Sequence, residues 1–163
     1  MYKSIVKIIL LLSIFLGIVS GLLTIVPYLG EIVFWLLITI AAPVVIMFLT
    51  RVNLLEITSV RQSAVIGALI GFISFLSFSA VYIPIVVILD KFFNYSSNPG
   101  VSMFLTNATV VLIIMLAVFM GVLSATINSF SGFVTYYLVE FNKSLKSKQN
   151  ENEYGQFNIR KQR

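Results

Sequence analysis

The residue types that carry most protein chemistry are missing from this chain or lie outside its apolar stretches. The 163 residues contain no cysteine and no histidine. This excludes disulfides, thiolate nucleophiles and thiolate metal sites, and it removes the usual general base. Apart from Lys7 near the start of the first run and Glu140 at the end of the fourth, the four long apolar runs contain no Asp, Glu, Lys or Arg. Because ionisable groups at membrane depth mark proton relays and most intramembrane catalysis, we predict no catalytic residue, no metal site and no cofactor.

Charged residues that could act together are found only at the ends of the apolar runs. Asp90 and Lys91 follow the third run, and Arg51, Glu56 and Arg61 lie in the loop before it. Charges at such positions meet water and help to orient the chain in the membrane. An enzyme acting at the membrane interface through this loop is therefore a distant third hypothesis.

Small residues form the clearest positive pattern. Gly17 and Gly21 lie four residues apart in the first run, and Gly67 and Gly71 repeat this spacing in the third. The fourth run carries a stripe at three- and four-residue steps, formed by Ala117, Gly121, Ser124, Ala125, Asn128, Ser131 and Gly132. Such stripes let helix backbones approach closely in lipid. Packing within one bundle is the simpler interpretation, and a stripe that faces a second copy or another membrane protein is the alternative.

Asn128 is the most polar residue expected at membrane depth. A hydrogen bond from Asn128 to another helix would contribute about 1 kcal/mol. The alternative is contact with a ligand or an ion, together with Ser124 and Ser131. We favour the structural role.

Composition places these residues on membrane-spanning helices. The chain is 59% hydrophobic and only 10% charged, whereas soluble domains carry roughly 25% charged residues. A soluble fold of this size could not bury so much apolar surface. We predict an all-α integral membrane protein in which residues 1–141 form a bundle of four transmembrane helices. The spans are expected at about 5–26, 32–50, 63–89 and 104–137.

Proline, glycine and capping residues divide the spans. Residues 27–31 form a short turn, so the first two spans make an antiparallel hairpin with Glu31 at the positive start of the second. Pro43 and Pro84 are predicted to kink the second and third spans. The Ser59-x-x-Gln62 pattern predicts the start of the third span.

The fourth run is the longest. Asn98-Pro99 is typical of a helix start, and the run that follows, from about 102 to 141, would be about 60 Å long as a straight helix. The hydrocarbon core is only about 30 Å thick, so this helix must tilt, break or project into water. We expect a change near residues 128–132. From residue 142 to 163 the composition predicts a basic, disordered tail apart from an extension of the helix.

Basic residues predict the orientation. Six of the eleven Lys and Arg residues lie in the tail, and only Lys91 falls on the outer side if the N-terminus is inside. We predict that both ends are cytoplasmic, at a bacterial inner (plasma) membrane. The lipid bilayer is the expected partner and nucleic acid is not, because the charge flanks the spans. Lys143, Lys146 and Lys148 are candidates for contact with anionic headgroups.

Two functional hypotheses follow. The first is a non-enzymatic structural or accessory membrane component that packs with itself or with a larger complex. The alternative is a passive pore or carrier for a small neutral or lipid-like solute, lined by Ser, Thr and Asn128. A hydroxyl-lined cavity joining the kinks at Pro43 and Pro84 would favour the carrier, and a packed interior would favour the structural component.

Overall fold

The computed structural model describes residues 2–55, 59–96 and 98–161. The regular elements in these ranges are all helices, joined by short turns. The helices in chain order are α1 (Tyr2–Leu23), α2 (Leu29–Arg51), α3 (Val60–Phe93), α4 (Pro99–Asn107) and α5 (Val110–Lys161). All except α4 contain a segment long and apolar enough to cross a membrane. This confirms the all-helical membrane class and the four candidate spans.

Two helix starts predicted from the sequence are confirmed by their capping hydrogen bonds. The Ser59 hydroxyl accepts from the Gln62 N–H (3.3 Å), and the Asn98 side-chain oxygen accepts from the Val101 N–H (3.3 Å). Each cap satisfies an amide that no helical carbonyl can reach. At the other end of α3, Asn94 adopts a left-handed conformation (φ 49°) that terminates the helix.

The fourth apolar run is two helices rather than one. α4 ends at Asn107, whose side-chain amide donates to the Met103 carbonyl (2.7 Å), and Ala108 is extended. Asparagine competes with the backbone for such bonds and so favours turns over helix interiors. The break therefore comes at residues 108–109, whereas residues 128–132, where we expected a change, are regular helix.

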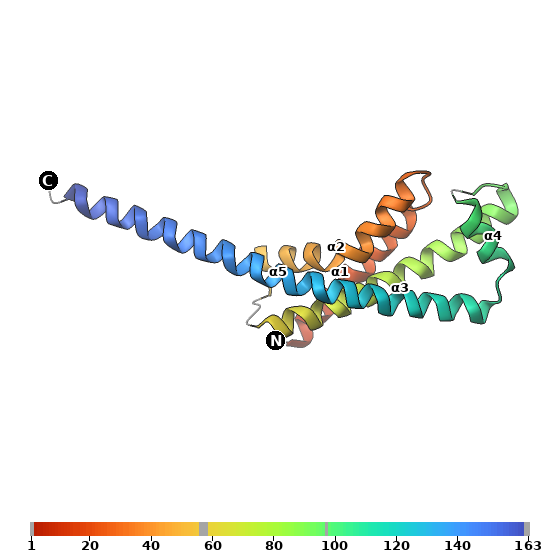
Figure 1. Cartoon of the computed structure of the whole chain (residues 1–163), viewed down its shortest axis with the longest axis horizontal. Coiled ribbons are helices and arrows are strands. Elements are labelled where there is room, and N and C mark those ends of the chain that lie inside the picture. The colour runs from red at the N-terminus through yellow and green to blue at the C-terminus, as the bar shows by residue number, and fades with distance from the viewer. Residues whose placement is uncertain (1, 56–58, 97, 162–163) are drawn as a thin grey trace.

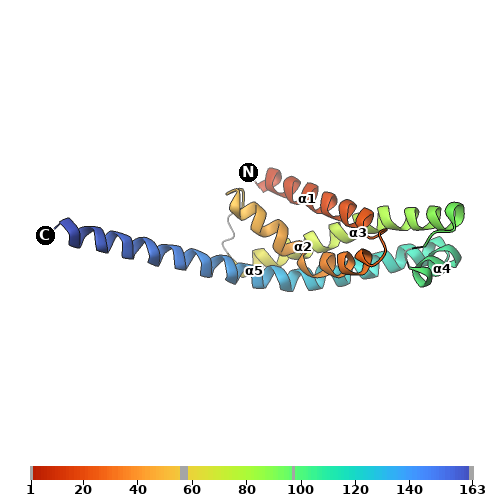
Figure 2. The same ribbon diagram turned by 90° about the horizontal axis from the view of Figure 1, so that it is seen from above.

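α5 is longer than the fourth span predicted from the sequence. Its apolar part covers Val110–Leu145 instead of residues 104–137, and the helix continues to Lys161. For residues 142–163 the composition predicts disorder apart from an extension of the helix, and α5 extends into this segment as far as Lys161. The segment contains no proline and is rich in Lys, Glu and Gln, which are good helix formers. Figures 1 and 2 show it leaving the bundle as a single helix.

α3 is the central helix and contacts each of the other four. The start of α1, the end of α2 and the start of α3 lie at the end of the bundle from which α5 projects (Figure 1). The α1–α2 turn and α4 lie at the opposite end. The apolar core is centred on α2 and α3, where its most buried members are Ile38, Ala42, Ile46, Leu49 and Ile70.

Candidate functional site

A buried polar centre joins α5 to the middle of α2. The Asn128 side chain is fully buried. Its oxygen accepts from the Ala42 N–H (2.8 Å), and its amide nitrogen donates to the Ile38 carbonyl (2.7 Å). In a regular helix these two backbone groups would bond to each other, because they lie four residues apart. The Asn128 carboxamide therefore bridges one step of the α2 hydrogen-bond ladder.

Pro43 follows Ala42 directly and makes α2 irregular at this point. Proline has no N–H, so the Thr39 carbonyl loses its helical donor and the helix bends, as Figure 1 shows. The Ser131 hydroxyl donates to this Thr39 carbonyl (2.8 Å). Ser131 follows Asn128 by three residues, so one side of α5 supplies partners for both irregular backbone positions of α2. Backbone groups in lipid need such partners, because water is absent.

The same stretch of α5 touches two glycines of α3. A Cβ atom added to Gly67 would collide with the Asn128 carbonyl oxygen, and one added to Gly71 would lie 2.6 Å from the Ser124 carbonyl oxygen. The Ser124 hydroxyl donates to the Gly71 carbonyl (3.0 Å) and is also fully buried. The backbones of α3 and α5 are thus in direct contact, which a side chain at either glycine would prevent.

The other end of the α5 stripe packs in the same way. The Ser63 hydroxyl donates to the Gly132 carbonyl (2.7 Å), and a Cβ atom on Gly132 would lie 2.6 Å from the Ser63 carbonyl oxygen. Gly121 has more room, because its nearest neighbour is the ring of Phe72 at 3.3 Å. Ala125 is half-buried.

The glycines of the first span form a separate contact between α1 and α3. A Cβ atom on Gly17 would collide with the Ser74 carbonyl oxygen, and one on Gly21 would lie 3.2 Å from the Phe78 carbonyl oxygen. The structure therefore places each predicted glycine pair against another helix of the same chain.

Sequence reasoning did not find the pairing of Ser131 with Pro43, or the role of Ser63. Ser131 belonged to the predicted stripe, but its spacing within α5 does not show which carbonyl of another helix it meets. Ser63 carried no signal beyond its position near the start of a predicted span.

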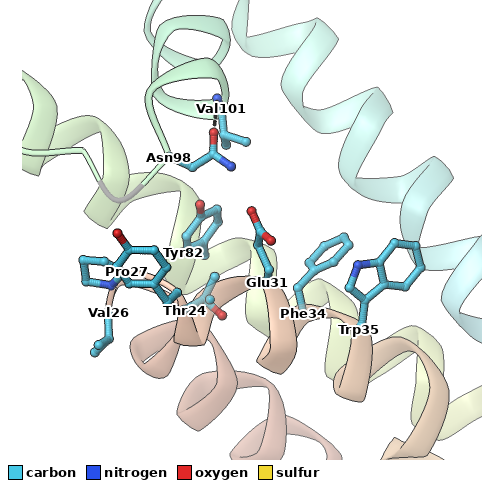
Figure 3. A pocket seen from close by; sticks show the side chains of 11 residues that line it. Thr24, Val26, Pro27, Glu31, Phe34, Trp35, Tyr82, Asn98 and Val101 are labelled. Carbon is cyan, nitrogen blue, oxygen red and sulfur yellow. Dashed lines mark hydrogen bonds between the residues drawn. The ribbon is translucent and has the colours of Figure 1, made fainter.

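A second feature, which we call the hairpin cleft, lies between the tip of the α1–α2 hairpin and the start of α4 (Figure 3). Its volume is about 550 Å³. Besides the hairpin turn, its walls are formed by Glu31, Phe34 and Trp35 of α2, Tyr82 of α3, and Asn98 and Val101 of α4. Figure 3 shows the Glu31 carboxylate and the Tyr82 hydroxyl pointing into the same space. The sequence predicted only a helix-start role for Glu31, and α2 in fact begins two residues before it.

A smaller groove of about 300 Å³ lies between α3 and α5. Apolar side chains such as Leu76, Ile83 and Ile113 form most of its walls, and Pro84 lies among them. Pro43 lines neither this groove nor the hairpin cleft. Neither cavity therefore joins the two kinks.

The charged candidates are dispersed. Lys143 is exposed on α5, and the side chains of Lys146 and Lys148 lie outside the described residues, as does Glu56 of the loop hypothesis. Within the part of the chain that the structure describes, no group of three or more Asp or Glu side chains could hold a metal ion.

Comparison with protein-family models, with curated proteins and with solved structures finds no match to this chain. Function is therefore inferred from the buried polar centre and the hairpin cleft.

Proposed function

We propose that this chain is a non-enzymatic membrane component that acts by packing, with a second copy or within a larger membrane complex. The observation that carries the proposal is the closed interior around Asn128. The carboxamide, the Ser124 hydroxyl and the Ser131 hydroxyl all bond to backbone groups of neighbouring helices. These groups are therefore occupied in holding the bundle together, and they are not directed towards a solute.

Other buried hydroxyls support the same proposal. Ser13 donates to the Ile9 carbonyl within α1 (2.8 Å), and Thr24, the residue after α1, donates to the Ser20 carbonyl of that helix (2.7 Å). Ser74 bonds in the same way to Gly71. A hydroxyl that bonds to its own helix needs no solute to satisfy it. A packed interior is what distinguishes a structural component from a passive pore.

The surface proposed to meet a partner is on α5. The small-residue stripes are used inside the chain, which supports packing within one bundle. The outer part of α5, by contrast, exposes large apolar side chains, including Val111, Met115 and Phe119, the last two being 65% and 67% exposed. Lipid covers this surface in an isolated copy, and a partner helix would replace that lipid in a complex.

The topology proposed from the basic residues places the end of the bundle that carries Arg51, Arg61 and the projecting part of α5 in the cytoplasm, at a bacterial inner membrane. The absence of cysteine makes this simple to test. Single variants Tyr28→Cys and Lys143→Cys, both at exposed positions, should react with an impermeant thiol reagent from opposite sides of the membrane. Contact of Lys143, Lys146 and Lys148 with anionic headgroups belongs to the same proposal.

The test of the packing proposal is purification from native membranes in mild detergent, followed by mass determination of the intact particle. A stoichiometric partner or a defined homo-oligomer is the expected result. In either case Gly71→Ala should lower the melting temperature without first dissociating the particle, because Gly71 contacts α5 of its own chain. A bare monomer that carries a bound solute would overturn the proposal in favour of the carrier.

The carrier alternative is favoured by one observation, the hairpin cleft. Its volume falls within the range of about 300–1,000 Å³ found for small-molecule sites. It lies at one end of the bundle, and Asn128 does not line it. The cleft therefore supports a binding site more directly than a path across the membrane.

A further inference from the structure

We propose that the hairpin cleft binds an organic ammonium group, a primary or quaternary amine with a small apolar part. Among the described residues that line the cleft, Glu31 is the only one with a charged side chain, and none is a lysine or arginine. The site thus presents one negative charge to a ligand. This favours a monovalent cation and disfavours phosphate or carboxylate ligands.

Aromatic rings form the rest of the recognition surface. The rings of Phe34 and Trp35 lie 6.0 Å apart and nearly perpendicular, at 80°, and Phe34 lies 6.0 Å from Phe78. Phe78 in turn stacks on Tyr82 at 5.2 Å. Figure 3 shows Tyr82 of α3 on one side of Glu31 and, on the other side, Phe34 followed by Trp35.

A carboxylate in a cleft lined by aromatic side chains matches the chemistry of an ammonium ion. The cation is attracted to the negative face of each ring and to the carboxylate, whereas its methyl or methylene groups cover apolar surface. A divalent metal ion fits less well, because Mg²⁺ and Ca²⁺ need several oxygen ligands and Glu31 supplies the only carboxylate among the described residues of the cleft. A neutral apolar ligand would leave the Glu31 charge without a partner.

The negative charge also has a structural role that the test must separate from binding. Glu31 lies in the first turn of α2, where the helix dipole favours an acidic side chain. Loss of this charge could therefore lower stability slightly without any ligand. Binding and melting must be measured on the same variants.

The experiment uses the full chain in a neutral detergent, with choline as the probe. Trp35 is the only tryptophan in the sequence and it lines the cleft, so its fluorescence emission reports whether the cleft is occupied. Calorimetry on the same samples detects binding that does not change this emission. We expect saturable binding. The dissociation constant should rise at least tenfold in Glu31→Gln and change less than twofold in Asp90→Asn, a matched carboxylate variant that does not line the cleft.

A neutral molecule of the same shape supplies the second control. In 3,3-dimethylbutanol a carbon atom replaces the nitrogen of choline, so it keeps the size and loses the charge. It should bind at least tenfold more weakly. Equal binding of the two molecules, equal binding by Glu31→Gln at unchanged melting temperature, or no saturable binding by either method would overturn the proposal.

The ammonium group could belong to a lipid headgroup or to a free molecule, and the same titration in nanodiscs distinguishes the two. If the natural ligand is a lipid, choline should bind more weakly in discs of phosphatidylcholine than in discs of an uncharged glycolipid, digalactosyldiacylglycerol, which has no ammonium group. If it is a free cation, the two discs should give the same affinity. The site can be absent while the packing proposal stands, because the two rest on different residues.

Discussion

Replacing Asn128 tests whether its carboxamide holds α2 to α5. Asn128→Leu keeps the number of side-chain atoms but cannot bond to the Ala42 N–H or to the Ile38 carbonyl, which now lie 2.8 and 2.7 Å from the carboxamide. Interhelical hydrogen bonds in membranes average about 0.6 kcal/mol and reach about 1.7. Two such bonds predict a loss of about 1–3 kcal/mol in the free energy of unfolding. The methyl groups of leucine cannot approach the Ala42 N–H and the Ile38 carbonyl as closely as the carboxamide does, so the loss of stability should not fall below this range.

Pro43 makes the prediction specific. In a Pro43→Ala background the N–H at position 43 returns, α2 can straighten, and Ala42 can bond to Ile38 within its own helix. Asn128→Leu should then be less destabilising by at least about 1 kcal/mol, which is a coupling that a double-mutant cycle measures. The assay is reversible unfolding in mixed micelles with increasing dodecyl sulfate, followed by circular dichroism.

The control for this cycle is Thr126→Val. Thr126 is exposed on α5 and its hydroxyl donates only to the Val122 carbonyl of the same helix (2.9 Å), so its replacement should change stability by less than about 0.5 kcal/mol. Two results would refute the proposed bridge. One is wild-type stability of Asn128→Leu, and the other is the same loss with and without Pro43.

Four further substitutions, one of them a control, test other contacts in the same unfolding assay. Ser131→Ala leaves the Thr39 carbonyl without a donor and should be destabilising by about 1 kcal/mol, and no loss at all would mean that this carbonyl is satisfied in another way. Gly71→Ala places a Cβ atom 2.6 Å from the Ser124 carbonyl oxygen and should be destabilising by about 1–3 kcal/mol. Gly121→Ala is the control and should be less destabilising, because its Cβ atom meets only the edge of a ring at 3.3 Å. Equal losses of stability in the two variants would contradict the close approach of α3 and α5. Ser102 is buried and its hydroxyl has no hydrogen-bond partner among the described residues. Ser102→Ala should therefore leave stability unchanged or raise it. A clear loss of stability would reveal a hydrogen bond that the structure lacks.

Features that depend only on residues close together in the sequence could be predicted. The four candidate spans follow from the length of the apolar runs, and the starts of α3 and α4 follow from Ser59 and Asn98. The break after Asn107 was not predicted, although asparagine and threonine are present there. The continuous apolar composition on both sides favours a single helix, and it outweighs the tendency of these two residues to form turns.

The contacts between helices could not be predicted in the same way. A small-residue stripe indicates that a helix face packs closely, but it does not identify the helix that it meets. Gly67 and Gly71 meet α5, whereas Gly17 and Gly21 meet α3, and the two pairs have the same spacing. The hairpin cleft was missed for a related reason, because Glu31 and Tyr82 lie on different spans and only the packing of α2 on α3 brings them together.

The buried polar centre and the hairpin cleft are linked through the bend in α2. Pro43 lies within the part of α2 that packs in the bundle interior, and Glu31 and Trp35, which line the cleft, lie between the start of the helix and this proline. Figure 1 shows that the hairpin end of α2 diverges from α5 beyond this bend. A straight α2 would bond its own Ala42 to Ile38 and would need neither Asn128 nor Ser131. The hydrogen bonds from α5 therefore stabilise the bent form over the straight one, and by fixing the bend they hold the aromatic wall of the cleft at its distance from α4.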